Sequence, residues 1–283
     1  MRALYWSLRK WLANPRRSWL EFLKWQNKYC AQLACRGMVW RGFSAWPIHP
    51  KHLFDPETAA HAQRFLGPGM RVLDVGCGSG AFCLKACELG AVGVVGLEHD
   101  AESVRQLQTV VAQRGYPLEV LAIDLERTPY PFEDGSFDLI NCSDVLEHLH
   151  RRVECLAELR RIKKNGAPIV VSIPNAETTW KRRLRQAGID SRDDTDHKIE
   201  YTQETLRAEI AQAGLRLEGP LLPVVPSFPW HGLLALCAVF SPALYRRAQR
   251  WKYACARRHP EESMGWVFHV IETDADQWRV NKV

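Results

Sequence analysis

Hydrophobic and polar residues alternate from about residue 70 in a way that predicts short strands separated by helices. Five apolar runs have the length and composition of buried strands. They are Met70–Val75, Val92–Leu97, Leu118–Ile123, Phe137–Cys142 and Pro168–Ile173. Each run is followed by residues that favour a turn, such as the three glycines after Val75 and the Pro174-Asn175 pair.

Helical periodicity fills most of the intervals between these strands. Helices are predicted over Ala81–Leu89, Ala101–Arg114, Arg151–Lys164 and Thr202–Ala213. Two further apolar runs, Leu215–Gly219 and Trp266–Ile271, are candidate final strands. Strands that alternate with helices of this length predict an α/β fold, with a doubly wound, mostly parallel, Rossmann-like sheet of seven strands.

Two segments do not follow this alternation, and they suggest a division into four parts. The first is a helical arm or lid at 1–50, in which Pro15 separates two short helices. The core follows at 51–222. A Pro-rich insertion of apolar and basic residues occupies 223–264, before the last strand. The final strand and tail form 265–283.

The composition is that of a globular protein, but the charge is unevenly distributed. The chain has 283 residues, is 46% hydrophobic and 25% charged, and carries a net charge of +6. Residues 1–50 hold nine Lys and Arg against one acid, and six of the eleven Trp. The arm therefore has a charge of +8 and the remainder a charge of −2, so the arm is the first candidate for a binding surface.

The cysteines and the apolar runs favour an intracellular location. The nine cysteines are scattered without any C-x-x-C pair, which excludes a zinc knuckle or a redox motif and is typical of free thiols. The longest apolar part that lacks Pro, Leu233–Phe240, is eight residues, whereas a membrane span needs roughly 20. The start of the chain lacks an apolar run of signal-peptide length. We expect a cytoplasmic protein whose contact with membranes, if any, is peripheral.

The strongest motif lies between the first strand and the first helix. Gly76, Gly78 and Gly80 alternate there with Cys77 and Ser79, and three such glycines let a ligand approach the backbone beside a helix N-terminus. Glu98 ends the second strand, where a carboxylate can accept two hydrogen bonds from a ribose diol. The alternative interpretation is an ordinary tight turn followed by a solvated acid.

The combination resembles class I S-adenosylmethionine (SAM)-dependent methyltransferases over about residues 68–220. Asp74, two residues before the first glycine, and Asp124 after the third strand are typical of that family, as is the run Phe132–Ile140. A dinucleotide dehydrogenase would instead carry G-x-G-x-x-G, and here Ala81 stands at its last position. The resemblance implies SAM as the cofactor. It implies these cofactor-binding residues: Asp74, Gly76, Cys77, Gly78, Gly80, Glu98, His99, Asp124, Leu125 and Cys142.

Within this resemblance, Glu98 would hold the ribose, Asp124 would accept from the adenine amino group, and the glycine turn would contact the methionyl part. Val145–Leu149 is similar to the V-L-E-H-L segment of small-molecule and lipid methyltransferases, and the N/D-P-P-Y motif of amino-group nucleic-acid enzymes is absent. Glu147 and His148 are therefore catalytic candidates, with His148 as the base that deprotonates a hydroxyl. The alternative is that His148 only shapes the pocket.

A later segment, Asp194–Thr202, supplies a third catalytic candidate, His197. It resembles the acceptor-pocket segment of these enzymes and also the metal-binding region of small-RNA 2′-O-methyltransferases. Some quinone-biosynthesis O-methyltransferases have a similar cluster. A divalent cation with Asp144, Glu147, His148 and His197 as ligands is the corresponding hypothesis, although Asp144 stands where that pattern has Glu.

Basic and aromatic residues are combined both in the arm and at 230–258, which suits peripheral contact with a membrane surface. The alternative is that the Trp side chains pack as a cap over the site. We expect methyl transfer to a hydroxyl, or a carbon, of a small amphiphilic acceptor such as a prenylated quinol, a lipid-linked glycan or a hydrophobic metabolite. The other hypotheses are an RNA ribose 2′-O-methyltransferase, for which no separate nucleic-acid-binding domain is visible, and a catalytically silent scaffold subunit.

Overall fold

The computed structural model describes residues 14–45, 47–54, 56–225 and 230–273. The chain forms two compact units. We call them the helical unit, comprising 1–56, 176–192 and 225–264, and the sheet unit, comprising 57–175, 193–224 and 265–283. No helix among the described residues is long and apolar enough to cross a membrane.

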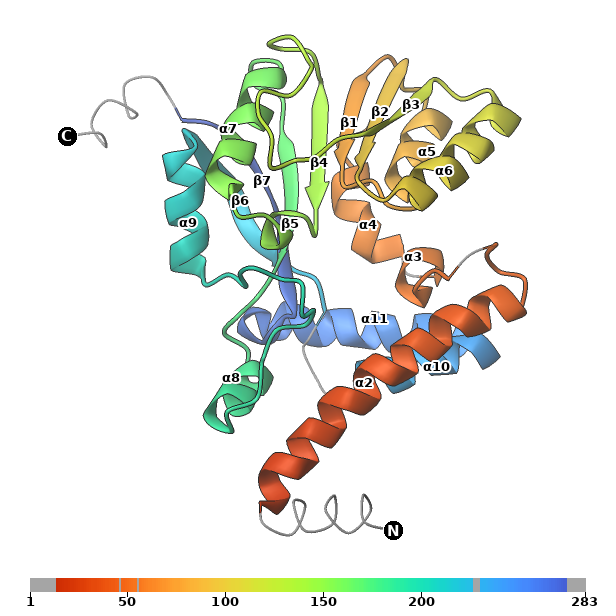
Figure 1. Ribbon diagram of the computed structural model, residues 1–283, viewed down its shortest axis with the longest axis vertical. Coiled ribbons are helices and arrows are strands. Elements are labelled where there is room, and N and C mark those ends of the chain that lie inside the picture. The colour runs from red at the N-terminus through yellow and green to blue at the C-terminus, as the bar shows by residue number, and fades with distance from the viewer. Residues whose placement is uncertain (1–13, 46, 55, 226–229, 274–283) are drawn as a thin grey trace, which may run out of the picture. The chain divides into compact units, whose positions relative to one another are not determined.

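The sheet unit is built on one seven-stranded sheet with the strand order β3-β2-β1-β4-β5-β7-β6 (Figure 1). The neighbours from β3 to β5 are parallel, and β7 runs antiparallel to both β5 and β6. The predicted mostly parallel, seven-stranded sheet is thus confirmed. The strands are β1 (Arg71–Val75), β2 (Gly93–Glu98), β3 (Leu118–Ala122), β4 (Leu139–Ser143), β5 (Ile169–Pro174), β6 (Leu215–Pro223) and β7 (Gly265–Glu272).

Helices cover both faces of this sheet (Figure 1). Alternate residues of a strand point to opposite faces, so Val72 packs with α5 and α6 while Leu73 and Val75 pack on the side of α7 and α9. Burial on both faces explains the continuous apolar runs in the sequence. The helices of this unit are α4 (Pro56–Gln63), α5 (Ala81–Glu88), α6 (Ala101–Arg114), the short η1 (Leu146–His148), α7 (Arg152–Ile162) and α9 (Gln203–Gln212).

Strand β6 is longer than the sequence pattern predicts. It continues beyond Gly219 to Pro223, and its register against β7 shifts between Glu218 and Leu222. An irregularity of this kind lets a strand that contains Gly219 and Pro220 remain paired.

The helical unit contains the arm and the insertion. Its elements are α2 (Pro15–Trp40), α3 (Pro50–Phe54), α8 (Thr179–Gln186), α10 (His231–Phe240), α11 (Pro242–Arg258) and the short η2 (Pro260–Glu262). Pro15 is the first residue of α2, and the Asn14 side chain accepts a hydrogen bond from the Arg17 N–H. The first of the two predicted arm helices falls on residues 1–13, outside the described residues. The second is a single helix of 26 residues.

Helices α2 and α10 pack closely inside the helical unit. A Cβ on Gly37 would lie 2.6 Å from the Val239 side chain, and one on Gly232 would lie 1.9 Å from the Asn27 carbonyl oxygen. Ala34 and Met38 of α2 form a core with Ala235, Ala238 and Val239 of α10. Small residues at these positions therefore permit the close approach that buries one face of α2.

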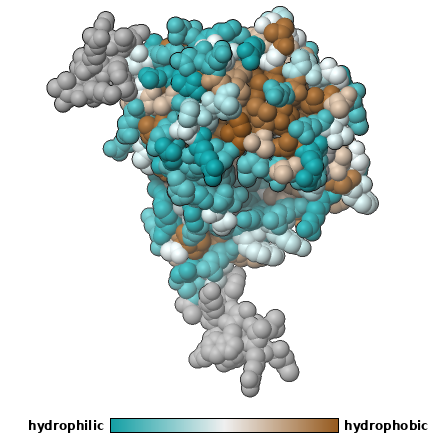
Figure 2. All heavy atoms as spheres, turned by 45° about the horizontal axis from the view of Figure 1, so that its top comes forward, coloured by the Kyte–Doolittle hydropathy of each residue, from teal (hydrophilic) through white to brown (hydrophobic). Residues whose placement is uncertain are grey.

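Hydrophilic residues cover most of the face shown in Figure 2, with hydrophobic residues gathered in one part of it.

Candidate functional site

The glycine turn between β1 and α5 is held by its own hydrogen bonds. The Cys77 N–H donates to the Leu97 carbonyl oxygen at 2.9 Å, and the Gly80 N–H donates to the Cys77 carbonyl oxygen at 2.8 Å. The Gly78 N–H donates to Oε2 of Glu98 at 2.9 Å. These three N–H groups are therefore engaged within the protein. A ligand can therefore approach the backbone of the turn closely, but these three N–H groups are not available to bind a phosphate.

Gly76 has no room for a side chain. Its φ of +68° lies in the left-handed region. A Cβ there would lie 2.5 Å from Cγ2 of Val145, in the turn after β4. The glycine thus lets the ends of β1 and β4 approach each other beside the pocket.

Asp74 lies beneath the turn and not in the pocket. It is 3% exposed and accepts hydrogen bonds from Nδ2 of Asn141 at 2.7 Å and from Sγ of Cys83 at 3.2 Å. Burial raises the pKa of its carboxyl to about 6. The two hydrogen bonds lower this pKa, but the effect of burial is larger. Asp74 therefore links β1, β4 and α5 and acts on the site by fixing the turn.

Glu98 ends β2 with its carboxylate held in place by backbone donors. Oε1 accepts from the His99 and Asp100 N–H groups at 2.8 and 2.9 Å, and Oε2 accepts from Gly78. The His99 ring nitrogen Nδ1 lies 3.0 Å from Oε1. A carboxylate has about four acceptor positions, so Oε2 retains one for a ligand hydroxyl.

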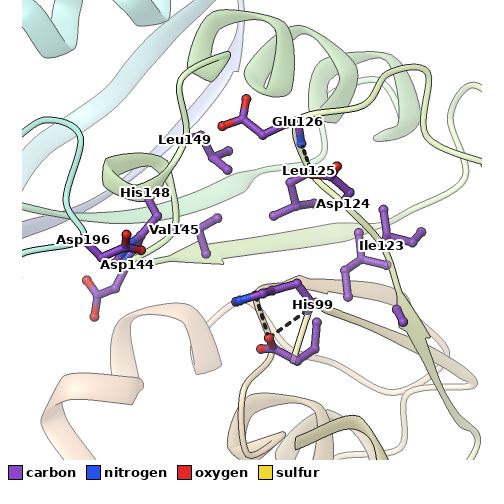
Figure 3. A pocket seen from close by; sticks show the side chains of 14 residues that line it. His99, Ile123, Asp124, Leu125, Glu126, Asp144, Val145, His148, Leu149 and Asp196 are labelled. Atoms are coloured by element: carbon purple, nitrogen blue, oxygen red, sulfur yellow. Dashed lines mark hydrogen bonds and ion pairs between the residues drawn. The ribbon is translucent and has the colours of Figure 1, made fainter. Parts of the chain in front are cut away.

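A pocket of about 610 Å³ opens at the carboxyl ends of β1 to β4, where ligands bind in open α/β sheets. Figure 3 shows His99 on one side, Ile123, Asp124 and Leu125 on a second, and His148 with Asp196 on the opposite side. The fourteen residues that line it are Gly76, Leu97, Glu98, His99, Ala122, Ile123, Asp124, Leu125, Glu126, Asp144, Val145, His148, Leu149 and Asp196.

The pocket is acidic. Five of the fourteen lining residues are Asp or Glu, and none of the fourteen is Lys or Arg. Two of these carboxylates pair with cations that do not line the pocket: Nε of Arg127 lies 3.1 Å from Oδ2 of Asp124, and Nζ of Lys198 lies 3.1 Å from Oδ1 of Asp196. This balance favours a ligand with positive charge and disfavours one that carries a pyrophosphate.

Residues after β3 form one wall and connect it to α7. Asp124 accepts from the Glu126 N–H at 3.0 Å. Glu126 in turn accepts from the N–H groups of His150 and Arg151 at 2.7 and 3.0 Å. Glu126 thus joins the segment after β3 to the start of α7. The sequence does not indicate this link, because Glu126 is 24 and 25 positions away from the two residues that donate to it.

His148 and His197 meet at the far side of the pocket although 48 residues separate them. Their ring centroids are 4.8 Å apart and the rings are nearly perpendicular, at 79°. The Glu147 carbonyl oxygen accepts from the Lys198 N–H at 2.6 Å, which fastens the two segments together. Nδ1 of His148 lies 3.3 Å from Oδ2 of Asp196. Hydrogen bonds from Lys198 and His148 lower the pKa of Asp196.

Glu147, His148 and His197 each offer one ligand atom, and these atoms lie within 4.8 Å of one another. A carboxylate and two imidazoles are a donor set that fits a divalent transition metal such as Zn²⁺ or Mn²⁺. Asp144 is not in this group of the described residues. Its carboxylate accepts from the Ser172 hydroxyl at 2.7 Å, and its φ is +56°.

The structure thus separates the predicted site residues into two sets. Gly76, Glu98, His99, Asp124, Leu125, His148 and Asp144 line the pocket, whereas Asp74, Cys77, Gly78, Gly80 and Cys142 do not. Cys142 is fully buried in β4. His197 and Glu147 do not line the pocket either, and they are 7% and 2% exposed. Asp196 also lines the pocket, although the sequence motifs do not single it out; its position beside His197 in the chain is a usable signal.

Residues 73–171 match the sequence profile of a family described as "Methyltransferase domain". The chain carries a class I SAM-dependent methyltransferase domain. In this family SAM is the cosubstrate, and the turn, the β2 carboxylate and the acidic pocket described above suit a sulfonium ligand.

Among curated proteins, this chain is 34% identical over 117 residues to "Ribosomal protein L11 methyltransferase" of Thermosipho africanus, and the match covers 41% of this chain and 42% of that protein. It is 29% identical over 131 residues to "Ubiquinone biosynthesis O-methyltransferase" of Xanthomonas campestris, which covers 46% and 54%. The chain therefore spans about half or less of the length of these relatives. Their acceptors differ, so the shared domain does not identify the acceptor.

Among solved structures, the chain is similar to the crystal structure of the [4+2]-cyclase SpnF. The TM-score is 0.57 at 19% identity, and the match covers 80% of this chain and 82% of that one. A likeness at this identity concerns the fold alone.

Proposed function

We propose that this chain transfers the methyl group of SAM to a hydroxyl group of a small amphiphilic acceptor. The observation that carries the proposal is the pocket at the ends of β1 to β4, with Glu98 and Asp124 on one side and the His148–Asp196 pair on the other. When bound, SAM supplies an electrophilic methyl group on a sulfonium ion. The residues present fit this group, since five carboxylates surround a pocket of about 610 Å³.

In this proposal Glu98 and Asp124 bind the ribose and the adenine amino group, and Gly76 allows the ligand to lie against the backbone. The carboxylate of Asp196 accepts from Nδ1–H of His148, which selects the tautomer with a basic Nε2. As the acceptor oxygen forms its bond to the methyl carbon, Nε2 takes the hydroxyl proton. The carbon–sulfur bond breaks and its electron pair stays on sulfur, so charge and atoms balance.

The apolar residues of the pocket support a small, partly hydrophobic acceptor. Val145 and Leu149 flank His148 along the chain, and both line the pocket with it. The lining residues include no Lys or Arg, so this part of the surface offers little to a polyanion such as RNA. Methyl transfer to a carbon atom would need the same base. The position of the methyl group in the product distinguishes transfer to carbon from transfer to oxygen.

The test is transfer of labelled methyl from SAM to hydroxylated amphiphiles of graded apolarity, with product analysis by mass spectrometry. We expect an O-methyl product whose formation depends on His148. Calorimetric titration with SAM separates the alternatives, because a scaffold subunit that has lost its cosubstrate would bind none. Methyl incorporation into an RNA extract and not into the amphiphiles would overturn the proposed acceptor class.

A second candidate is cation-assisted transfer to a vicinal diol or catechol, favoured by the clustering of Glu147, His148 and His197. These three residues would hold the cation, which would supply Lewis acidity toward the acceptor oxygen. Metal analysis of the purified protein, with activity before and after a chelator, distinguishes this candidate. Unchanged activity with no bound metal leaves His148 as a base acting with Asp196 alone.

A further inference from the structure

Exposed hydrophobic side chains are concentrated in the helical unit. Of the fourteen large hydrophobic residues exposed among the described residues, only Leu89 and Val92 belong to the sheet unit. The other twelve are Trp19, Phe22, Trp25, Tyr29, Val39, Trp40, Phe43, Trp230, Leu233, Phe240, Leu244 and Trp251. Single exposed apolar residues are common on soluble proteins, but such a concentration marks an interaction surface.

Four of these side chains form a continuous aromatic row along α2. Ring centroids are 5.5 Å apart between Trp19 and Phe22, 6.3 Å between Phe22 and Trp25, and 5.1 Å between Trp25 and Tyr29. The four residues are 43% to 59% exposed. The row is preorganised, because its members already contact one another along one helix.

The aromatic row is not the face that holds α2 in place. The buried residues of this helix recur every three or four positions at Leu23, Gln26, Cys30, Ala34 and Met38. This second stripe includes the contacts with α10, and the two helices lie side by side within the unit (Figure 1). Folding of the helical unit therefore leaves the aromatic row available for a partner.

The same unit carries a large positive charge. Its described residues include 18 Lys and Arg against five Asp and Glu, a net charge of +13, whereas the whole chain has +6. Glu21, the single acid of α2, is paired with Arg17 at 3.0 Å. Beside the aromatic row, a hollow of about 350 Å³ is lined by Trp25 and Tyr29 together with Lys24, Lys28, Glu21, Gln32 and Ile189.

Helix α11 repeats the combination of apolar and basic residues. Leu244 and Trp251, 57% and 64% exposed, are seven residues apart and so share one face with Arg247 and Arg258. Residues 242–258 contain six Lys and Arg and no acid. Lys252 is buried with Nζ 2.9 Å from Nδ1 of His231, and the five arginines are exposed.

We propose that the exposed faces of α2 and α11 dock on a membrane surface that contains anionic phospholipid. Trp and Tyr side chains with an apolar body and a polar edge suit the depth of the lipid headgroups, and Lys and Arg beside them meet the phosphates. The hollow beside Trp25 and Tyr29 joins both features at one point. The docking is peripheral, in agreement with the lack of a membrane-crossing helix among the described residues.

A lipid surface fits these residues better than single-stranded RNA does. Stacking of bases requires free aromatic faces, but Trp25 and Tyr29 cover one face of each other at an interplanar angle of 9°. Val39, Leu233 and Leu244 have no aromatic face to offer, whereas insertion among lipids stabilises aliphatic and aromatic side chains alike.

The test is cosedimentation of the full-length protein with vesicles of phosphatidylcholine alone and of phosphatidylcholine mixed with phosphatidylserine. We expect binding to the mixed vesicles only, and weaker binding at high salt. The double variant Trp25→Ala/Tyr29→Ala and the charge reversal Lys28→Glu should each weaken binding about tenfold or more. Val92→Ala and Arg105→Glu are the matched controls in the sheet unit, and neither should change it.

Circular dichroism of each variant establishes that it is folded. Equal sedimentation with and without the anionic lipid, or equal effects of the α2 variants and their controls, would overturn the proposal. The proposal would also be overturned if the protein did not bind the vesicles but bound RNA, or associated with itself, in a way that the α2 variants abolish. The proposal does not depend on the proposed reaction, because Glu98→Gln should bind vesicles normally while SAM binding is impaired.

Discussion

The imidazole rings of His148 and His197 lie 4.8 Å apart, edge to face, with a carboxylate neighbour at each ring: Asp196 at His148 and Glu200 at His197. The His148 side chain is 35% exposed toward the pocket and that of His197 only 9%. The exposed ring is therefore suited to act on an acceptor, and the buried ring supports it.

Replacement of His148 should abolish most of the activity without loss of SAM binding. We expect His148→Ala to lower kcat by about 10²- to 10⁴-fold, the usual contribution of a positioned base. Asp196→Asn should lower kcat less, because it removes only the carboxylate that orients the ring. The control is His150→Ala, whose side chain is exposed and outside the pocket. Equal kcat for His148→Ala and this control would exclude His148 as the base.

Glu98→Gln should weaken SAM binding by roughly 1–3 kcal/mol, since a charged acceptor is lost from the position that we propose for the ribose. The amide has nearly the shape of the carboxylate, but its NH2 group replaces one of two oxygens that both accept from backbone N–H groups. Calorimetric titration measures the effect. Glu102→Gln, on an exposed acid of α6, should leave the affinity unchanged. An unchanged affinity in Glu98→Gln would remove Glu98 from the site.

Asp74 should make the stability of the fold depend on pH in a defined direction. Burial raises the pKa of this carboxyl from 3.8 to about 6 in the folded protein. Between these values the folded state binds more protons than the unfolded state. The Asp74 contribution to the free energy of unfolding therefore falls as pH rises from about 4 to about 6, by about 3 kcal/mol.

The variant Asp74→Asn has no titrating carboxyl at this position. Comparison of the variant with the parent therefore separates the effect of Asp74 from that of all other titrating groups. Urea unfolding of both proteins from pH 4 to 7 should show the variant gaining about 3 kcal/mol relative to the parent over that range. A difference that stays constant with pH would show that Asp74 does not titrate in this way.

Substitution at Gly76 should destabilise the protein more than the same substitution at Gly78. Both residues have positive φ, at +68° and +50°, so alanine costs about 1–2 kcal/mol at either from the backbone alone. At Gly76 the added Cβ also meets Val145 at 2.5 Å, whereas at Gly78 no atom lies within 4 Å. Thermal unfolding of Gly76→Ala and Gly78→Ala measures the difference. Equal midpoints would show that Val145 moves aside without cost.

Several of these features follow from sequence alone. Continuous apolar runs indicate strands that are buried on both faces, as in a parallel sheet. The turn with Gly76, Gly78 and Gly80, together with Glu98, indicates where the pocket forms. The start of α2 at Pro15 and the end of α6 at Gly115 are local effects of proline and glycine backbone preferences. Such features depend on residues close together in the chain, so pattern and spacing suffice.

Other features required the tertiary structure. The juxtaposition of His197 and Asp196 with His148 depends on a backbone hydrogen bond from Lys198 to Glu147, 51 residues apart in the chain. The burial of Asp74 beneath the turn, rather than in the pocket, depends on Asn141 of the neighbouring strand β4. The continuation of β6 past Gly219 depends on its pairing with β7.

The basic, Trp-rich arm shows the same division. Its charge and aromatic content are properties of the sequence, and they already favoured a surface contact. Only the packing of α2 against α10 decided which side chains that contact can use, because burial of Leu23, Ala34 and Met38 leaves Phe22, Trp25 and Tyr29 exposed on the same helix. Periodicity predicts that a helix has two faces, and only the position of its neighbours determines which of them meets solvent.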